Sequence, residues 1–274
     1  MKILAIEASG LVASVAVTED DVLKAEFTVN NKLTHSQTLL PMLKKMMDIL
    51  GETVRDMDAV AVSAGPGSFT GLRIGAATAK GLALAADLPV IKVSSLEALM
   101  HQVSADRDDV ICPIMDARRG QVYCGAWKDG KKLMEEKAEA VEYLLEELDK
   151  LGESFIFSGD GVPVYKEIIK ERLKSKNKSV YFADSCNNRQ RAASVGAVGI
   201  KKYRAWLEKN KLTPEAVKSE GTAAHKNFDD DVMSSDDFVP EYLRKPQAER
   251  EKDAGLLEDA GKKSLRKIAN GNRS

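Results

Sequence analysis

The sequence is poor in cysteine and has no long hydrophobic run. Its three cysteines, Cys112, Cys124 and Cys186, are odd in number and show no C-x-x-C spacing. This pattern argues for reduced thiols rather than for a disulfide or zinc framework. No segment reaches the roughly 18 consecutive apolar residues of a membrane span, and the short run after Lys2 is too brief for the core of a signal peptide. We therefore expect a soluble, cytoplasmic protein without membrane contact.

The chain also lacks a strong charge of either sign. With 30% charged residues and a formal net charge of −1, it has no overall basic excess of the kind that favours nucleic-acid binding. Histidine is scarce: His35, His101 and His225 have no companion histidine or cysteine at metal-ligand spacing, so no metal site is predicted. The 274 residues, 43% of them hydrophobic, suffice for one large or two modest domains.

The most distinctive stretch is a strand, a tight turn and a glycine-rich helix. Residues 58–62 predict a short buried strand, and Gly65-Pro66-Gly67 ends it. A helix is expected from Ser68 to Asp87. Four small residues on it are spaced by four: Gly71, Gly75, Ala79 and Ala83. Because an interior glycine costs about 1 kcal/mol relative to alanine, this stripe predicts a contact surface where another backbone approaches closely.

The same turn could instead bind an anion, because a helix N-terminus presents free amides. A P-loop needs lysine directly after its last glycine, where Leu72 follows Gly71, and a dinucleotide loop needs glycine where Thr70 stands. We favour packing and keep anion binding as the alternative. The residues that would line such a cleft are Ser9, Gly65, Gly67, Ser68 and Arg118.

A repeated order of elements organises the whole chain. Three strands are expected at 3–7, 12–18 and 22–29, followed by a helix at 34–50 with Pro41 inside it, the strand and helix above, a strand at 89–93 and a helix at 95–103. The order then begins again, with strands at 109–116, 121–127 and 132–136, a helix at 141–151, a strand at 154–158, a helix at 164–174, a strand at 179–183 and a helix at 192–209.

This repeat predicts an α/β protein of two domains, 1–108 and 109–246, each a mixed sheet with flanking helices. Residues 213–237 are polar and are expected to form a loop. The last segment, 247–274, is highly charged and is expected to be a disordered tail or a frayed helix.

Several motifs together resemble the TsaB family, also called YeaZ, over about residues 1–246. They are Gly65-Pro66-Gly67-Ser68-Phe69-Thr70-Gly71-Leu72-Arg73-Ile74-Gly75 with Lys80-Gly81-Leu82, His35-Ser36 before Leu39-Leu40-Pro41, Ser95-Leu96-Glu97-Ala98-Leu99, Asp116-Ala117-Arg118-Arg119-Gly120 with Val122-Tyr123, Gly159-Asp160-Gly161, and Pro240-Glu241-Tyr242-Leu243-Arg244. Each piece alone is weak, whereas the set is highly specific.

The resemblance implies the duplicated actin/Hsp70/sugar-kinase fold, in which each domain is RNase H-like. It further implies a non-catalytic subunit without a cofactor, which pairs with the catalytic paralogue TsaD and works with the ATPase TsaE. Together these proteins transfer threonylcarbamoyl to the adenosine beside the anticodon of tRNAs that read codons beginning with A. This chain would meet tRNA only through the complex.

The residues are compatible with a subunit that performs no chemistry. An actin-type ATP site needs an aspartate at the end of the first strand and small turns around phosphate. Here that strand ends in Glu7, where relatives usually carry aspartate, and the equivalent second turn holds the bulky Arg118 and Arg119. An ATP-using enzyme of the same fold remains the alternative. A glycoprotease-type metallopeptidase is a weaker one. It would need a metal or a nucleophile, and the chain has neither histidines at metal-ligand spacing nor a G-x-S-x-G motif.

The resemblance also implies where the partner binds, since TsaB and TsaD are thought to join through equivalent helices of their first domains. Here these are the helices at 34–50 and 68–87, both more apolar than a helix on one sheet requires. The expected interface residues are Leu39, Leu43, Met46, Met47, Leu50, Gly71, Leu72, Gly75 and Ala79. Whether the isolated chain forms a homodimer is left open.

Overall fold

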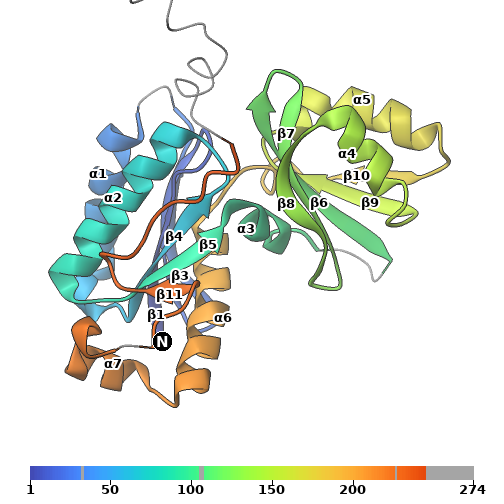
Figure 1. Ribbon diagram of the computed structural model, residues 1–274. Coiled ribbons are helices and arrows are strands. Elements are labelled where there is room, and N and C mark those ends of the chain that lie inside the picture. Colours follow the sequence, from blue (N-terminus) through green and yellow to red (C-terminus); the bar gives the residue numbers. More distant parts are fainter. Residues whose placement is uncertain (32–33, 105–107, 226, 245–274) are drawn as a thin grey trace, which may run out of the picture. The chain divides into compact units, whose positions relative to one another are not determined.

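The computed structural model describes residues 1–31, 34–104, 108–225 and 227–244. Residues 1–241 form one compact unit, separate from the unit 242–274. The expected charged tail, 247–274, lies outside the described residues. Figure 1 shows the arrangement of the elements in the first unit.

The first sheet is mixed and has the strand order β11-β5-β4-β1-β2-β3. Its strands are β1 (Lys2–Glu7), β2 (Ala13–Glu19), β3 (Val22–Val29), β4 (Ala59–Gly65), β5 (Val90–Ser94) and β11 (Val232–Met233). Side chains of β1 alternate between two cores: Leu4 and Ile6 face one, and Ile3 and Ala5 the other. Helices α1 (His35–Leu50) and α2 (Phe69–Ala86) cover the first face (Figure 1).

The second sheet has the strand order β10-β9-β6-β7-β8. Its strands are β6 (Asp109–Arg118), β7 (Gln121–Lys128), β8 (Lys131–Ala140), β9 (Ser154–Ser158) and β10 (Ser179–Phe182). Helices α4 (Val141–Leu148) and α5 (Val162–Lys174) bury their apolar sides on one face. Apart from β11, both sheets follow the same topology, which confirms the expected duplicated fold of two mixed sheets with flanking helices.

The third helix of each half packs on the sheet of the other half. Helix α3 (Ser95–His101) places Leu96 and Leu99 against Met115 and Trp127 of the second sheet. Helix α6 (Ala192–Asn210), from the second half, packs on β1, β2 and β5 of the first sheet. A Cβ atom built on its Gly199 would lie 2.8 Å from Ala61, so glycine is required for this close approach.

The structure differs from the expected domain boundary at α6 and β11. The apolar side of α6 packs on the second face of the first sheet, and β11 pairs with β5 at its edge. The expectation of a loop at 213–237 is also wrong in part. That segment contains helix α7 (Pro214–Glu220), a 3₁₀ helix at Thr222–Ala224, and strand β11, which pairs antiparallel with β5. Another 3₁₀ helix lies at Val54–Asp56.

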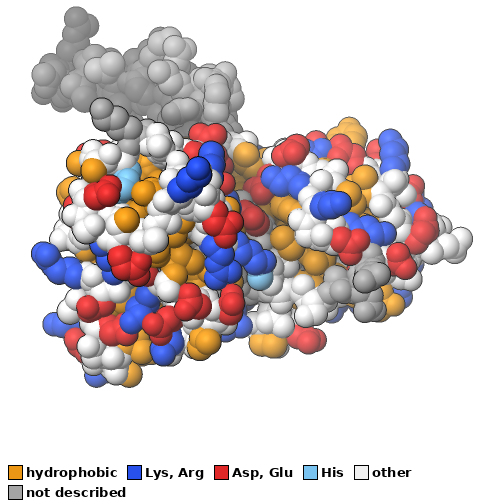
Figure 2. Space-filling model, turned by 90° about the horizontal axis from the view of Figure 1, so that it is seen from below, with side chains coloured by type: hydrophobic (Ala, Val, Ile, Leu, Met, Phe, Trp, Pro, Cys, Tyr) orange, Lys and Arg blue, Asp and Glu red, His pale blue; other side chains and the backbone are white. Residues whose placement is uncertain are grey.

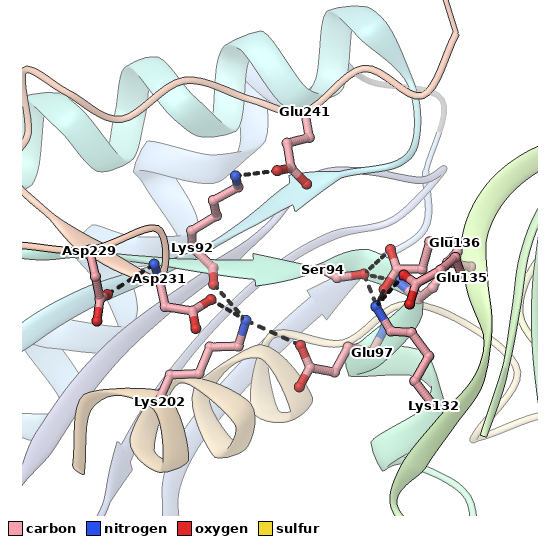
Figure 3. Close-up of polar contacts among 11 residues, drawn as sticks. Lys92, Ser94, Glu97, Lys132, Glu135, Glu136, Lys202, Asp229, Asp231 and Glu241 are labelled. Carbon is pink, nitrogen blue, oxygen red and sulfur yellow. Dashed lines mark hydrogen bonds and ion pairs between the residues drawn. The ribbon is translucent and has the colours of Figure 1, made fainter. Parts of the chain in front are cut away.

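Ion pairs connect α6 and the segment around β11 to the first sheet and to α3 (Figure 3). The Nζ atom of Lys202 on α6 lies 3.2 Å from a carboxylate oxygen of Glu97 on α3 and 2.7 Å from one of Asp231, just before β11. Lys92 of β5 forms an ion pair with Glu241. The lysines therefore connect α3, α6, β5 and the end of the first unit.

Candidate functional site

The carboxyl group of Glu7 ends β1 and is fully enclosed. Its exposed fraction is 0%, and its Oε1 atom accepts a hydrogen bond of 2.5 Å from the backbone N–H of Ser9. Its Oε2 atom is buried and has no hydrogen-bond partner among the described residues. Burial raises the pKa of Glu7 to about 7, against the opposing effect of hydrogen bonds from Ser9 and Ser63. Glu7 is therefore partly protonated near neutral pH.

Gln190, from the loop before α6, fills the space beside Gly10. It is 1% exposed, and a Cβ atom built on Gly10 would lie 2.6 Å from its Oε1 atom. Burial also raises the pKa of Asp160, whose carboxyl group contributes to the raised pKa of Glu7. The Gln190 amide lies beside the carboxyl group of Asp160 and opposes the rise of its pKa. We call Glu7, Ser9, Ser63, Asp160 and Gln190 the Glu7 cluster.

Within the Glu7 cluster, Glu7 itself is closed to a ligand, whereas Asp160 is half-buried. A hard cation such as Mg²⁺ binds accessible carboxylate oxygens, and Glu7 has none because its exposed fraction is 0%. The described residues contain no group of three or more His, Cys, Asp or Glu side chains placed to hold a metal ion. The end of β1 therefore offers buried hydrogen-bonding groups but no exposed charge.

The glycine turn before α2 packs against the chain's own backbone. A Cβ atom on Gly67 would overlap the carbonyl oxygen of Ser9, and one on Gly65 would overlap that of Glu241. The backbone N–H of Ser68 donates to the Ser9 oxygen at 2.7 Å, and the Ser68 hydroxyl accepts from the N–H of Gly71 at 3.3 Å. These amides, which an anion would need, already have partners. The geometry therefore favours the packing interpretation over the anion site.

Arg118, the remaining residue of the proposed cleft, lies outside the Glu7 cluster. It is the exposed last residue of β6, and Arg119, also exposed, follows it in the hairpin loop between β6 and β7. The backbone N–H of Arg118 donates to Asp116 at 2.8 Å, and the N–H of Asp116 donates to Asp160 at 3.3 Å. The loop is thus connected to the cluster through backbone groups, while its arginine side chains face solvent.

Most residues expected at the partner interface are buried in the chain's own core. This holds for Leu39, Leu43, Met46, Met47, Gly71, Leu72, Gly75 and Ala79, while Leu50 is half-buried. A Cβ atom on Gly71 would overlap the carbonyl oxygen of Ala8, and one on Gly75 would lie 3.2 Å from the Cβ atom of Ala8. The close backbone approach expected from the glycines exists, but the approaching backbone is the end of β1. These eight residues are therefore not available on the surface for a partner, contrary to the expectation.

The outward side of α2 carries a different set of small and apolar residues. Its exposed residues are Thr70, Arg73, Ala77, Gly81, Leu84 and Ala85, of which only Arg73 is charged. Leu84 is 68% exposed. A Cβ atom on Gly81 would meet no atom of the described residues within 4 Å, so packing among them does not require glycine there. Lys80, half-buried beside this face, donates to the backbone oxygens of Asp236 and Phe238.

The three histidines lie apart and have separate structural roles. His35 begins α1, and its Nε2 atom lies 3.0 Å from the carbonyl oxygen of Gly10. His101 lies at the end of α3, 2.7 Å from the Nζ atom of Lys201. His225 packs edge-on against Trp206.

Gln190 was not singled out from the sequence. It has no local signal, because its role depends on a contact with Gly10, which lies far away in the chain. Gly81 was noted only within a family motif, although it interrupts a helix on the side away from the Gly71 stripe. The described residues contain no helix that is long and apolar enough to cross a bilayer.

Comparison with known proteins identifies the family. The chain matches, over residues 27–252, the family model TsaD, described as tRNA N6-adenosine threonylcarbamoyltransferase. It is 31% identical over 209 residues to the tRNA threonylcarbamoyladenosine biosynthesis protein TsaB of Bacillus subtilis, which covers 75% of this chain and 90% of that protein. It is 34% identical over 180 residues to TsaB of Escherichia coli, with 62% and 76% covered.

A solved structure, YeaZ from Pseudomonas aeruginosa, has a similar fold. The TM-score is 0.64 at 22% identity, with 88% of this chain and 99% of that chain covered. The chain belongs to the TsaB/YeaZ family, whose named members are tRNA threonylcarbamoyladenosine biosynthesis proteins.

Proposed function

We propose that this chain is a non-catalytic subunit that binds a TsaD-like catalytic paralogue through the outward side of α2. Within that complex, and with a TsaE-like ATPase, it would serve the transfer of threonylcarbamoyl to the adenosine beside the anticodon of tRNAs reading codons that begin with A. The roles of TsaE and of these tRNAs follow from the family resemblance alone. A cytoplasmic location follows from the same proposal.

The observation that carries the proposal is Gly81. In an exposed helix interior, glycine costs about 1 kcal/mol relative to alanine, and no atom of the described residues would lie within 4 Å of a Cβ atom at Gly81. A partner backbone that packs closely at this position would account for it. Exposed Leu84 and Ala85 beside it would supply apolar area for burial, at roughly 25 cal/mol per Å².

The enclosed carboxyl group of Glu7 supports the non-catalytic part of the proposal. In an enzyme of this fold, a carboxylate at the end of the first strand would have to reach the metal or phosphate of a nucleotide. Glu7 is enclosed, and the amides of the turn before α2 bind the backbone of Ser9 and the side chain of Ser68 instead. An ATP-using enzyme would need these groups to open.

The partner proposal is tested by substitutions on the outward side of α2. Gly81→Leu should leave a folded chain with equal or higher stability, because leucine favours the helix. Its affinity for the TsaD-like paralogue of the same organism should fall more than tenfold, about 1.4 kcal/mol in titration calorimetry. Leu84→Asp should weaken binding in the same way.

The matched control is Val164→Asp on α5, since Val164 is also an exposed apolar helix residue, at 59%. It should leave the affinity unchanged. If the two α2 variants bind as tightly as wild type, α2 is not the interface. ATP hydrolysis by the isolated chain with repeated turnover would support the enzyme alternative instead.

A further inference from the structure

The hairpin loop between β6 and β7 places arginines where the backbone is left-handed. The φ angles of Arg118, Arg119 and Gly120 are +63°, +57° and +73°. Arg118 pairs with Gln121, so Arg119 and Gly120 form a two-residue loop, and the register shifts between Asp116 and Arg118. Positive φ at both loop positions is the pattern that favours Asn-Gly or Asp-Gly. Arginine at two successive left-handed positions is unfavourable.

The next hairpin of the same sheet provides a direct contrast. Between β7 and β8 the loop is Asp129-Gly130, with φ angles of +50° and +72°. This is the composition that such a loop favours. The favoured loop composition is therefore present at the β7–β8 hairpin and absent at the β6–β7 hairpin. Side-chain chemistry, rather than turn formation, is the reason to have arginine at 118 and 119.

Neighbouring elements hold the loop in place. The N–H of Arg118 donates to the carboxylate of Asp116 at 2.8 Å, and the hydroxyl of Tyr165 on α5 donates to the same oxygen at 3.2 Å. The N–H of Val141, the first residue of α4, donates to the carbonyl oxygen of Gly120 at 3.2 Å. Both helices therefore fix the backbone that carries the two arginines.

Both guanidinium groups are exposed, and neither forms an ion pair with any residue that the structure describes. On the molecular face drawn in Figure 2, basic and acidic side chains are interspersed rather than separated. The whole chain has a net charge of −1. A polyanion would therefore be bound by local cations such as Arg118 and Arg119, not by an overall positive charge.

We propose that the Arg118-Arg119 loop is a contact for the phosphate backbone of RNA, positioned for the tRNA bound by the complex. The inference rests on the proposed function. Guanidinium groups bind phosphate oxygens with two parallel hydrogen bonds, and contacts to phosphate position a protein on a nucleic acid without reading its sequence. An exposed pair of arginines on an anchored backbone suits this task. An acidic protein surface is the competing occupant, and the experiment separates the two.

The test uses the complex of the full chain with the TsaD-like paralogue. Its ligand is an unmodified transcript of a tRNA that reads codons beginning with A. In fluorescence anisotropy at several salt concentrations, the R118Q/R119Q variant should bind tRNA at least about tenfold more weakly at low salt. The slope of log K against log salt should become shallower by about 1 to 2, as phosphate contacts are lost. Unchanged affinity and slope would overturn the proposal.

The matched control is R172Q/R204Q, which removes the same charge from two exposed arginines on α5 and α6. It should leave tRNA binding unchanged, and an equal loss in both variants would show a general charge effect instead. Calorimetry with the paralogue alone should give wild-type affinity for R118Q/R119Q. A loss there would assign the loop to an acidic protein surface. If the wild-type complex does not form or does not bind tRNA, the proposed function itself fails.

A second variant separates binding from folding. R118G/R119N places residues that tolerate positive φ in the loop, so its melting temperature should rise by about 2 to 4 °C. Its tRNA affinity should nevertheless fall as far as that of R118Q/R119Q. A melting temperature equal to or below that of wild type would refute the conformational argument. R118K/R119K should recover only part of the affinity that R118Q/R119Q loses, because lysine keeps the charge but cannot form the two parallel hydrogen bonds.

Discussion

At the scale of single residues, Glu7 links the closed site to the stability of the fold. An isolated glutamate has a pKa near 4.5, and burial raises the pKa of Glu7 to about 7. Between these values the unfolded chain releases a proton that the folded chain retains. The free energy of unfolding therefore falls as pH rises through this window, and the loss is complete above it.

The Glu7→Gln variant removes this titration while keeping an oxygen that can accept from Ser9. Relative to wild type, its free energy of unfolding should increase from about pH 4.5 to about pH 8, by an amount on the order of 3 kcal/mol. Urea denaturation of both proteins at the two pH values measures it. A constant difference between them would mean that Glu7 is not protonated in the folded state.

The glycines of α2 show what a residue pattern can and cannot predict. The spacing of Gly71 and Gly75 correctly indicated that a backbone comes close, because a side chain there has no room. It could not indicate which backbone. The sequence assigned it to a partner, and the structure assigns it to Ala8 of the same chain.

At the scale of elements, α6 depends on a carboxylate from a distant strand. Glu26 of β3 accepts a hydrogen bond of 3.0 Å from the N–H of Ala193, in the first turn of α6, and forms an ion pair with Arg191. The hydroxyl of Ser14 accepts from the N–H of Ala192 at 3.0 Å. The helix N-terminus therefore obtains its capping groups from the first sheet rather than from adjacent residues.

Glu26→Ala should therefore destabilise the protein by about 2 kcal/mol, since an N-terminal amide and a partly buried arginine lose their partner. Glu26→Gln retains an acceptor for Ala193 and should lose less. Chemical denaturation of both variants measures the difference. Wild-type stability in Glu26→Ala would show that α6 does not need this cap.

Helices and strands with strong periodicity were predicted well from the sequence. The expected helices at 34–50 and 68–87 correspond to α1 and α2, and the expected strands of both halves are present. Helix α7 and strand β11 were missed. Helix α7 has seven residues and β11 has two, so neither is long enough to show a clear period.

At the scale of the whole molecule, the segment after α6 belongs to the core of the first sheet. Val217 and Val232 are 1% and 0% exposed and lie in the core cluster that α6 forms with that sheet. Phe238, at 1%, lies in the cluster beneath α1 and α2. The indole N–H of Trp206 donates to the carbonyl oxygen of Asn227 at 3.1 Å.

Two truncations test this arrangement. A chain that ends after residue 211 should lose more than about 5 kcal/mol, because several fully buried side chains are removed, and this approaches the stability of an ordinary domain. It should show no cooperative thermal transition by circular dichroism. A chain that ends after residue 246 should melt as wild type does and bind the paralogue equally well. Similar melting of both truncated chains would contradict the assignment of 212–241 to the core.

The sequence by itself determined the repeated order of elements, the fold class and the family. These depend on local periodicity, turn residues and motifs, all of which lie within short stretches of chain. Only the tertiary structure decided which face of each helix is buried, because a helix with apolar residues on several sides is compatible with more than one orientation. It also decided that α6 returns to the first sheet and that Gln190 closes the space beside Gly10, since both depend on contacts between residues far apart in the chain.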